Sequence, residues 1–145
     1  MKSKLLSEGQ EKTWALVFET GDEVVETLEL FARMHHLSAS HFTAIGAFSD
    51  ATLGYFDVAT KEYSRIPLEE QVEVLSLVGD IALLKEEPKI HAHVVLGKSD
   101  GTAWGGHLLQ AHVRPTLEVI LIESPRHLRR KLDPETGLPL IQLEG

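Results

Sequence analysis

Apolar residues recur at steps of three and four in one stretch near the amino terminus. Val24, Leu28 and Phe31 fall on one side of a helical wheel, and charged residues fall on the other. This pattern predicts an amphipathic helix over residues 22–37. The residues 20–23 (TGDE) have the Ser/Thr-x-x-Glu spacing of a capping box, which places the start of the helix near Asp22.

Elsewhere the apolar residues come in short runs that are separated by Gly, Asp and Pro, which is typical of β-strands. The spacing leaves no room for a crossover helix between most neighbouring runs, so we expect antiparallel pairing with the helix covering one face. The sequence thus predicts an α+β domain, with a mostly antiparallel sheet of short strands and one main helix. The predicted strands are residues 14–18, 42–47, 52–58, 62–66, 72–77, 81–84, 90–96, 107–113 and 117–123.

The chain has 145 residues, which suits one globular domain with a core that needs no metal or disulfide to hold it. We treat residues 1–145 as a single domain, including the basic segment and tail at 124–145. The sequence contains no cysteine, which excludes disulfides, a cysteine nucleophile and thiolate metal sites. Any metal ligand must therefore come from His, Asp or Glu.

The charge balance argues against a nucleic-acid partner. Lys and Arg number 14 and Asp and Glu number 22, so the formal net charge is −8. A domain this acidic lacks the overall positive field that draws proteins to phosphate backbones. No apolar stretch reaches the roughly 20 residues of a membrane span, and the first twelve residues lack the apolar run of a signal peptide. We therefore expect a cytoplasmic protein that does not contact membranes.

The candidate chemistry is concentrated in the histidines of residues 90–113. In an extended strand His91 and His93 lie on the same face, about 6.6 Å apart along the chain. The turn-forming GKSDG segment predicts a hairpin, and centring it on Asp100 places His93 opposite His107. Three imidazoles that converge in this way match a catalytic-type zinc site with one open position, and they suit other divalent transition metals as well.

Other polar features give less specific signals. His112 is a candidate fourth ligand or a polar neighbour of the metal. The basic run at residues 126–131 is a candidate contact for an anion or a partner, although such clusters on acidic domains usually form solvated or salt-bridged edges. The glycine-rich hairpin matches no phosphate-binding motif, and no serine lies in a hydrolase elbow. The basic residues of the run are Arg126, Arg129, Arg130 and Lys131.

Four long segments carry a family pattern: GAFSDATLGYFD (46–57), EQVEVLSLVGDIAL (70–83), HAHVVLGKSDGTAWGGHL (91–108) and TLEVILIE (116–123). Together they resemble the PPC family, the plants and prokaryotes conserved domain, also known as DUF296. The resemblance implies a compact α+β domain that assembles as a homotrimer. It also implies a metal site at the HxH and GGH histidines, here His91, His93 and His107. Glu73 matches the family's acidic strand position and is a candidate second-layer residue or ligand.

Three functional hypotheses follow. The first is a homotrimeric module that binds a divalent metal, zinc before others, with water or a small anionic ligand in the open position. The second is a DNA-binding or transcription-associated protein, after the family's usual label. That label comes largely from plant members with an AT-hook, and nothing before Trp14 resembles one, so the chain is similar to stand-alone prokaryotic members. The third is a metal-dependent enzyme of unknown substrate, with Glu73 or Asp80 as the proton acceptor.

Overall fold

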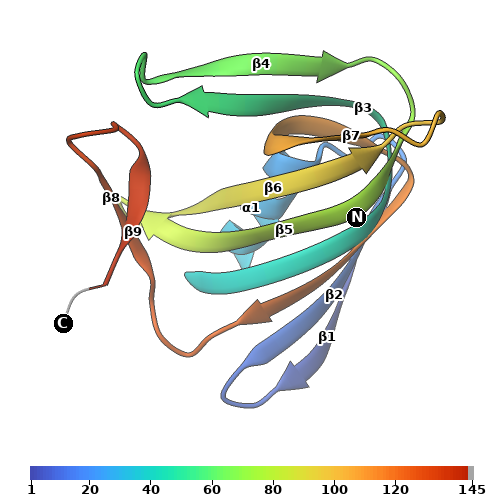
Figure 1. The fold of residues 1–145 in the computed structure, drawn as a ribbon. Coiled ribbons are helices and arrows are strands. Elements are labelled where there is room, and N and C mark those ends of the chain that lie inside the picture. Colours follow the sequence, from blue (N-terminus) through green and yellow to red (C-terminus); the bar gives the residue numbers. More distant parts are fainter. Residues whose placement is uncertain (144–145) are drawn as a thin grey trace.

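Nine strands and one helix make up residues 1–143, the part of the chain that the computed structural model describes (Figure 1). In chain order they are β1 (Lys2–Glu8), β2 (Lys12–Glu19), α1 (Val24–Met34), β3 (Ala39–Asp57), β4 (Glu62–Leu68), β5 (Val72–Leu84), β6 (Glu87–Gly97), β7 (Ala103–Glu123), β8 (Arg129–Leu132) and β9 (Pro139–Gln142). All the strands belong to one sheet, in the order β1-β2-β7-β3-β5-β8-β9, with β4 beside β3 and β6 beside both β5 and β7. Every pairing of strands is antiparallel except the short parallel pair of β5 and β8.

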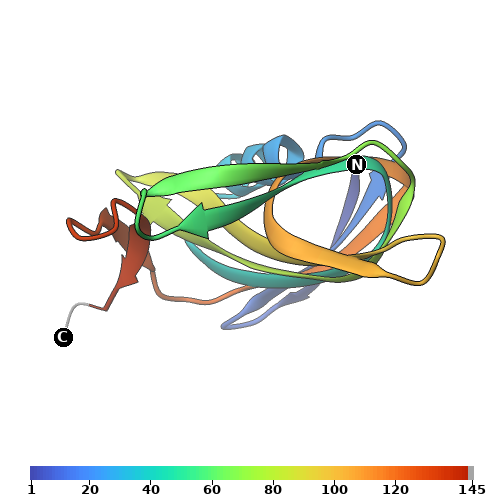
Figure 2. The same ribbon diagram turned by 45° about the horizontal axis from the view of Figure 1, so that its top comes forward.

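The sheet closes on itself in its middle. β3 pairs with β5, β5 with β6, β6 with β7, and β7 again with β3. These four strands therefore form a ring that satisfies backbone groups on both edges of each strand, and the sheet curves strongly as a result (Figure 2). α1 contacts β6 and β7. This helix has 11 residues, and no helix in the described part of the chain is long and apolar enough to cross a membrane.

The predicted fold class is wrong, because the chain is far richer in strand than an α+β domain with one main helix. Strands hold 66% of the residues in a mixed sheet, and the one helix holds 8%. The predicted short strands 42–47 and 52–58 merge into β3, which has 19 residues. The register of β3 against its neighbours shifts near Gly46 and Asp50, so the polar residues Ser49 and Asp50 between the two predicted runs lie at a β-bulge rather than in a turn.

The helix is also shorter than predicted, and its start is capped differently. The Thr20 hydroxyl donates to the carbonyl of Pro115 at 3.3 Å, so it does not cap the helix. The cap is Glu23, whose carboxylate accepts a hydrogen bond from the amide of Glu26 at 2.6 Å. The helix ends before His36, which has a positive φ of 54° and so cannot continue a right-handed helix.

The core fills the space between the helix and the inner face of the curved sheet. The predicted apolar stripe of Val24, Leu28 and Phe31 is buried there, against strand residues that include Phe42 and Phe48. The tail contains the hairpin of β8 and β9, which the sequence analysis did not predict. Because β8 pairs with the end of β5, this hairpin lies beside the strands that carry the candidate chemistry.

Gly46 is expected to be essential for stability, because β3 and β7 approach closely there. A Cβ atom at this position would lie 2.2 Å from the carbonyl oxygen of Thr116 and 2.8 Å from the Cα of Leu117. Both contacts are with backbone, which cannot move without separating the strands. Gly46→Ala should therefore destabilise the fold by about 3 kcal/mol or more, measured by chemical denaturation. The control is Gly9→Ala, whose Cβ would lie 3.9 Å from its nearest neighbour; equal stability of the two variants would contradict this account.

Candidate metal site

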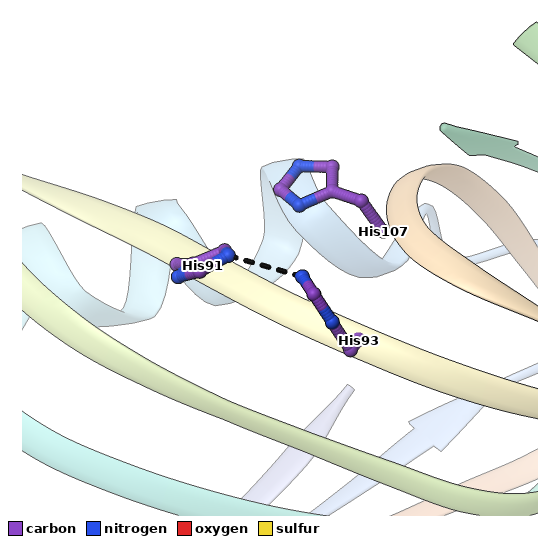
Figure 3. A group of neighbouring side chains, drawn as sticks. All are labelled: His91, His93 and His107. Carbon is purple, nitrogen blue, oxygen red and sulfur yellow. Dashed lines mark hydrogen bonds between the residues drawn. The ribbon is translucent and has the colours of Figure 1, made fainter. Parts of the chain in front are cut away.

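Three histidines come together where β6 meets β7 (Figure 3). Alternate residues of β6 are buried in the core, which places His91 and His93 on the outer face of the strand. The hairpin pairs His93 with His107, so the register predicted by centring the turn on Asp100 is confirmed. Two neighbouring strands thus bring three imidazoles to one place.

The imidazoles are close enough to share one ion. Nε2 of His91 lies 3.2 Å from Nε2 of His93, and one nitrogen from each of the three rings lies within 4.8 Å of the others. Two nitrogens on a tetrahedral zinc ion, each at 2.0–2.1 Å, are about 3.3 Å apart. The His91–His93 pair therefore already has a chelating distance, and a small side-chain movement brings His107 to it. Within residues 1–143 no other three His, Asp or Glu side chains bring their ligand atoms this close together.

The protonation of the cluster also fits a metal site. Burial, followed by the neighbouring imidazoles, lowers the pKa of His107 from 6.5 to about 4. Burial and the charge of Arg130 lower the pKa of His91. Neutral imidazoles have the free lone pair that a metal ion requires. Nδ1 of His107 is buried and has no hydrogen-bond partner in the described structure, so the ring has unused binding capacity.

An ion pair lies behind His91. Asp80 of β5 is paired with His91 in the sheet, and its carboxylate lies 3.9 Å from Nδ1 of that histidine. The same carboxylate accepts a short hydrogen bond from the guanidinium of Arg130 on β8, which is buried. Metal-binding histidines commonly direct their second nitrogen at a carboxylate, so Asp80 is placed to orient His91.

Two other candidate residues do not join the cluster. Glu73 pairs with Gly97, and along β5 it is about 16 Å from the position opposite His93, at 3.3 Å per residue. His112 lies further along β7, where its Nδ1 is 2.8 Å from a carboxylate oxygen of Asp50. Of the two proposed proton acceptors, the structure brings only Asp80 near the histidines.

The basic run does not form one continuous cationic surface. Arg130 is buried against Asp80, and Arg129 forms a short ion pair with Glu86. Arg126 and Lys131 are exposed. The run therefore serves in part to attach the carboxy-terminal hairpin to the sheet.

Tyr63 also lies at the cluster, although no sequence motif predicts it there: its ring centroid lies 5.1 Å from that of His107. Tyr63 belongs to β4, which reaches the site because β3 pairs with both β4 and β7. At Gly54 these pairings place Arg65 on one side and His107 on the other. No local sequence pattern predicts such a contact, because it depends on how three strands pair.

In the metal-free protein, NMR titration should find the pKa of one histidine above 6.5 and that of another below it. The hydrogen bond to Asp50 raises the pKa of His112, whereas burial lowers that of His107 to about 4. The contribution of His112 to stability is full below pH 6.5 and is lost as the pH rises through its raised pKa. That of His107 is present above pH 6.5 and is lost as the pH falls towards 4, because only the unfolded chain then takes up the proton. Identical titration of both histidines near 6.5 would contradict the burial of His107 and the hydrogen bond of His112.

Proteins of known structure resemble this chain over nearly its whole length. A metal-containing protein from Archaeoglobus fulgidus is 34% identical, with a TM-score of 0.84 and coverage of 98% of this chain and 97% of that one. A protein from Bacteroides thetaiotaomicron, described as a "putative dna binding protein", is 26% identical, with a TM-score of 0.87 and coverage of 97% and 96%.

A curated relative is much longer than this chain. The bifunctional protein GlmU of Synechococcus sp. strain JA-3-3Ab is 31% identical over 142 residues, which is 96% of this chain and 22% of that protein. This chain thus spans about a fifth of the curated relative. The family model of the Plants and Prokaryotes Conserved (PCC) domain matches residues 6–125. Because that match covers most of the sequence, the chain belongs to the plants and prokaryotes conserved (PPC, or PCC) domain family.

Proposed function

We propose that this protein is a homotrimeric module that binds one divalent metal ion per chain, zinc before other transition metals, through His91, His93 and His107. The observation that carries the proposal is the convergence of three ring nitrogens within 4.8 Å. The lowered pKa values of His91 and His107 keep these two rings neutral at physiological pH. The description of the Archaeoglobus relative as metal-containing supports the same conclusion.

Three protein ligands leave a tetrahedral ion with one open position, as in catalytic rather than structural zinc sites. A bound divalent ion supplies Lewis-acid chemistry there. Around the cluster, the Asp80 carboxylate lies 3.9 Å from Nδ1 of His91, and the centroid of the Tyr63 ring lies 5.1 Å from that of His107. The open position suits water or a small anion, and it is also what a metal-dependent enzyme of this family would need.

The outer face of the sheet supports self-association. Val78 lies directly opposite the exposed His93, and Thr43 of β3 lies between Val78 and Ile120. Large apolar side chains on this face are solvent-exposed in the single chain: Val17, Ile45, Leu75, Val78, Val95 and Ile120. A contiguous exposed apolar patch usually marks an interface. We propose that copies of the chain bury this face in a trimer, beside the metal site.

A charge in this face should dissociate the trimer. Ile45→Asp introduces a carboxylate opposite Glu118, in the middle of the proposed interface. By light scattering, the wild type should have three times the 16.1 kDa mass of the chain, and the variant should have the mass of one chain. The matched control is Val58→Asp, an equally exposed valine beyond the end of β3, which should remain trimeric. A wild-type protein with the mass of a monomer would refute the trimer.

Metal content is the test of the metal function. Untagged protein purified without added metal should contain about one equivalent of a divalent ion per chain by elemental mass spectrometry. Zinc added to chelator-treated protein should raise the melting temperature, because a ligand that binds only the folded state stabilises it. Protein that neither retains an ion nor is stabilised by zinc, cobalt or nickel would exclude this function.

DNA binding is the second candidate, supported by the description of the Bacteroides relative. The net charge of −8 and the pairing of Arg129 and Arg130 with carboxylates weigh against it. Fluorescence anisotropy with an AT-rich duplex at low salt, where phosphate contacts are strongest, is the appropriate measurement. We expect no saturable binding; tight binding that weakens steeply with salt would favour DNA instead.

A further inference from the structure

A largely apolar pocket opens directly beside the histidine cluster. Its volume is about 260 Å³, and His91 and His107 form part of its wall. Aliphatic side chains and the Tyr63 ring form most of the rest, and the cations Lys89 and Arg130 also line the pocket. The aliphatic lining residues are Leu84, Ile90, Leu138, Pro139 and Leu140.

The charges around this pocket are balanced before any metal binds. Arg130 is paired with Asp80, and Lys89 Nζ lies 3.3 Å from a carboxylate oxygen of Glu29. The histidine ligands of the proposed site are imidazoles and not carboxylates, so they do not cancel the charge of a divalent ion. A metal at the cluster would therefore add two uncompensated positive charges at the edge of an apolar pocket. Such a site favours an anion at the metal and an apolar group in the pocket.

One wall of the pocket comes from the hairpin of β8 and β9, which follows the residues 6–125 that match the family model. Arg130 fixes this wall. One guanidinium nitrogen donates to the carbonyl of Pro139 at 2.8 Å, and another donates to Asp80 beside His91. Leu138 and Leu140 are thereby held against the same space as the histidines.

We infer that this pocket binds a small carboxylate whose other end is a branched or aromatic apolar group, and that the carboxy-terminal hairpin selects for that group. The inference rests on the proposed metal function, because the carboxylate takes the open position on the ion. The apolar end of the ligand packs against Leu84, Ile90 and Leu140. The hairpin is thus a specificity element of this chain.

Cobalt-loaded protein provides the test, because its visible spectrum reports ligands that enter the coordination sphere. The probes are acetate, 4-methylpentanoate, which has the same head group with four more carbons, and the uncharged 4-methylpentanamide. Burial of the added carbons should make 4-methylpentanoate bind at least about 10-fold more tightly than acetate. The amide should bind at least about 10-fold more weakly than 4-methylpentanoate.

Two matched variants locate the selectivity. Leu140→Asp places a charge in the pocket wall and should abolish the preference for 4-methylpentanoate over acetate. Leu132→Asp changes a more exposed leucine of the same hairpin, outside the pocket lining, and should retain the preference. Elemental analysis of each cobalt-loaded sample should show one ion per chain, since neither leucine is a proposed ligand.

The outcomes separate the two proposals. If no cobalt is retained, both the metal function and the ligand inference fail. If cobalt is retained but the two carboxylates bind equally, or do not bind, the ligand inference fails and the metal function stands. If the preference is present but unchanged in Leu140→Asp, the assigned role of the hairpin is wrong.

Discussion

Replacing His93 with alanine is expected to weaken zinc binding at least about 100-fold. His93 supplies one of three ligands, its Nε2 is 3.2 Å from that of His91, and it lies opposite His107. The variant retains two imidazoles, so the ion would have only two protein ligands instead of three. Losses of 10–100-fold are typical when a residue behind the ligands is changed, so loss of a ligand should exceed them. Competition with a chromophoric zinc chelator measures the change.

The control for this variant is His112→Ala. His112 is bonded to Asp50 outside the cluster, and its loss should leave zinc affinity within about 2-fold of the wild type. His93 is exposed, so the metal-free His93→Ala protein should fold normally, as judged by circular dichroism. Wild-type zinc affinity in a folded His93→Ala variant would show that the ion is held elsewhere.

Arg130→Met is expected to produce the largest loss of stability among the changes near the site. The Arg130 side chain is 6% exposed, and its partner Asp80 would lose its cation. Removing one member of a buried ion pair costs about 3–5 kcal/mol, and the 31% exposure of Asp80 reduces this to about 2–3 kcal/mol. For a chain of this size we expect a fall in melting temperature of roughly 5–10 °C.

A second variant distinguishes an uncompensated charge from lost packing. In the double variant Asp80→Asn with Arg130→Met no charge is left unpaired, so it should recover at least half of the lost stability. Arg126→Met, which changes an exposed arginine in the same basic run, should alter stability by less than about 0.5 kcal/mol. An Arg130→Met protein that melts within 1 °C of the wild type would show that the hairpin is not fixed through this pair.

The histidine hairpin could be predicted because its geometry is local. A period of two along the strand places His91 and His93 on one face, and the turn at Asp100 determines that His93 meets His107. The apolar stripe of the helix is local in the same sense. Both follow from residues at most sixteen positions apart, for which spacing alone determines which side chains lie together.

The length of the strands and the surroundings of the site could not be predicted in this way. Ser49 and Asp50 interrupt the apolar pattern as turn residues would, yet they lie inside β3, at a shift in its register against β7. The sequence pattern therefore predicts two short strands where the structure has one long strand. Tyr63 reaches His107 only because β3, the hairpin partner of β4, also pairs with the distant strand β7. Arg130 reaches Asp80 only because β8 pairs with the end of β5. Such contacts depend on the order of strands in the sheet, which no spacing along the chain encodes.

The role of the basic run shows the same limit. Four cations in six residues predict an exposed charged segment or a surface that binds anions. The backbone alternation of β8 instead directs Arg130 inwards to Asp80, while Arg129 faces out to Glu86. Burial of one arginine follows from where β8 joins β5, and that position became visible only in the fold.

The central claim is that one divalent ion is held by His91, His93 and His107 of the same chain. Anomalous diffraction at the zinc absorption edge, from crystals of untagged protein grown without added metal, tests it most directly. We expect one anomalous peak per chain, about 2.0–2.1 Å from a ring nitrogen of each of the three histidines. A fully occupied peak bound to other residues, or protein crystals with no peak at the cluster, would contradict it.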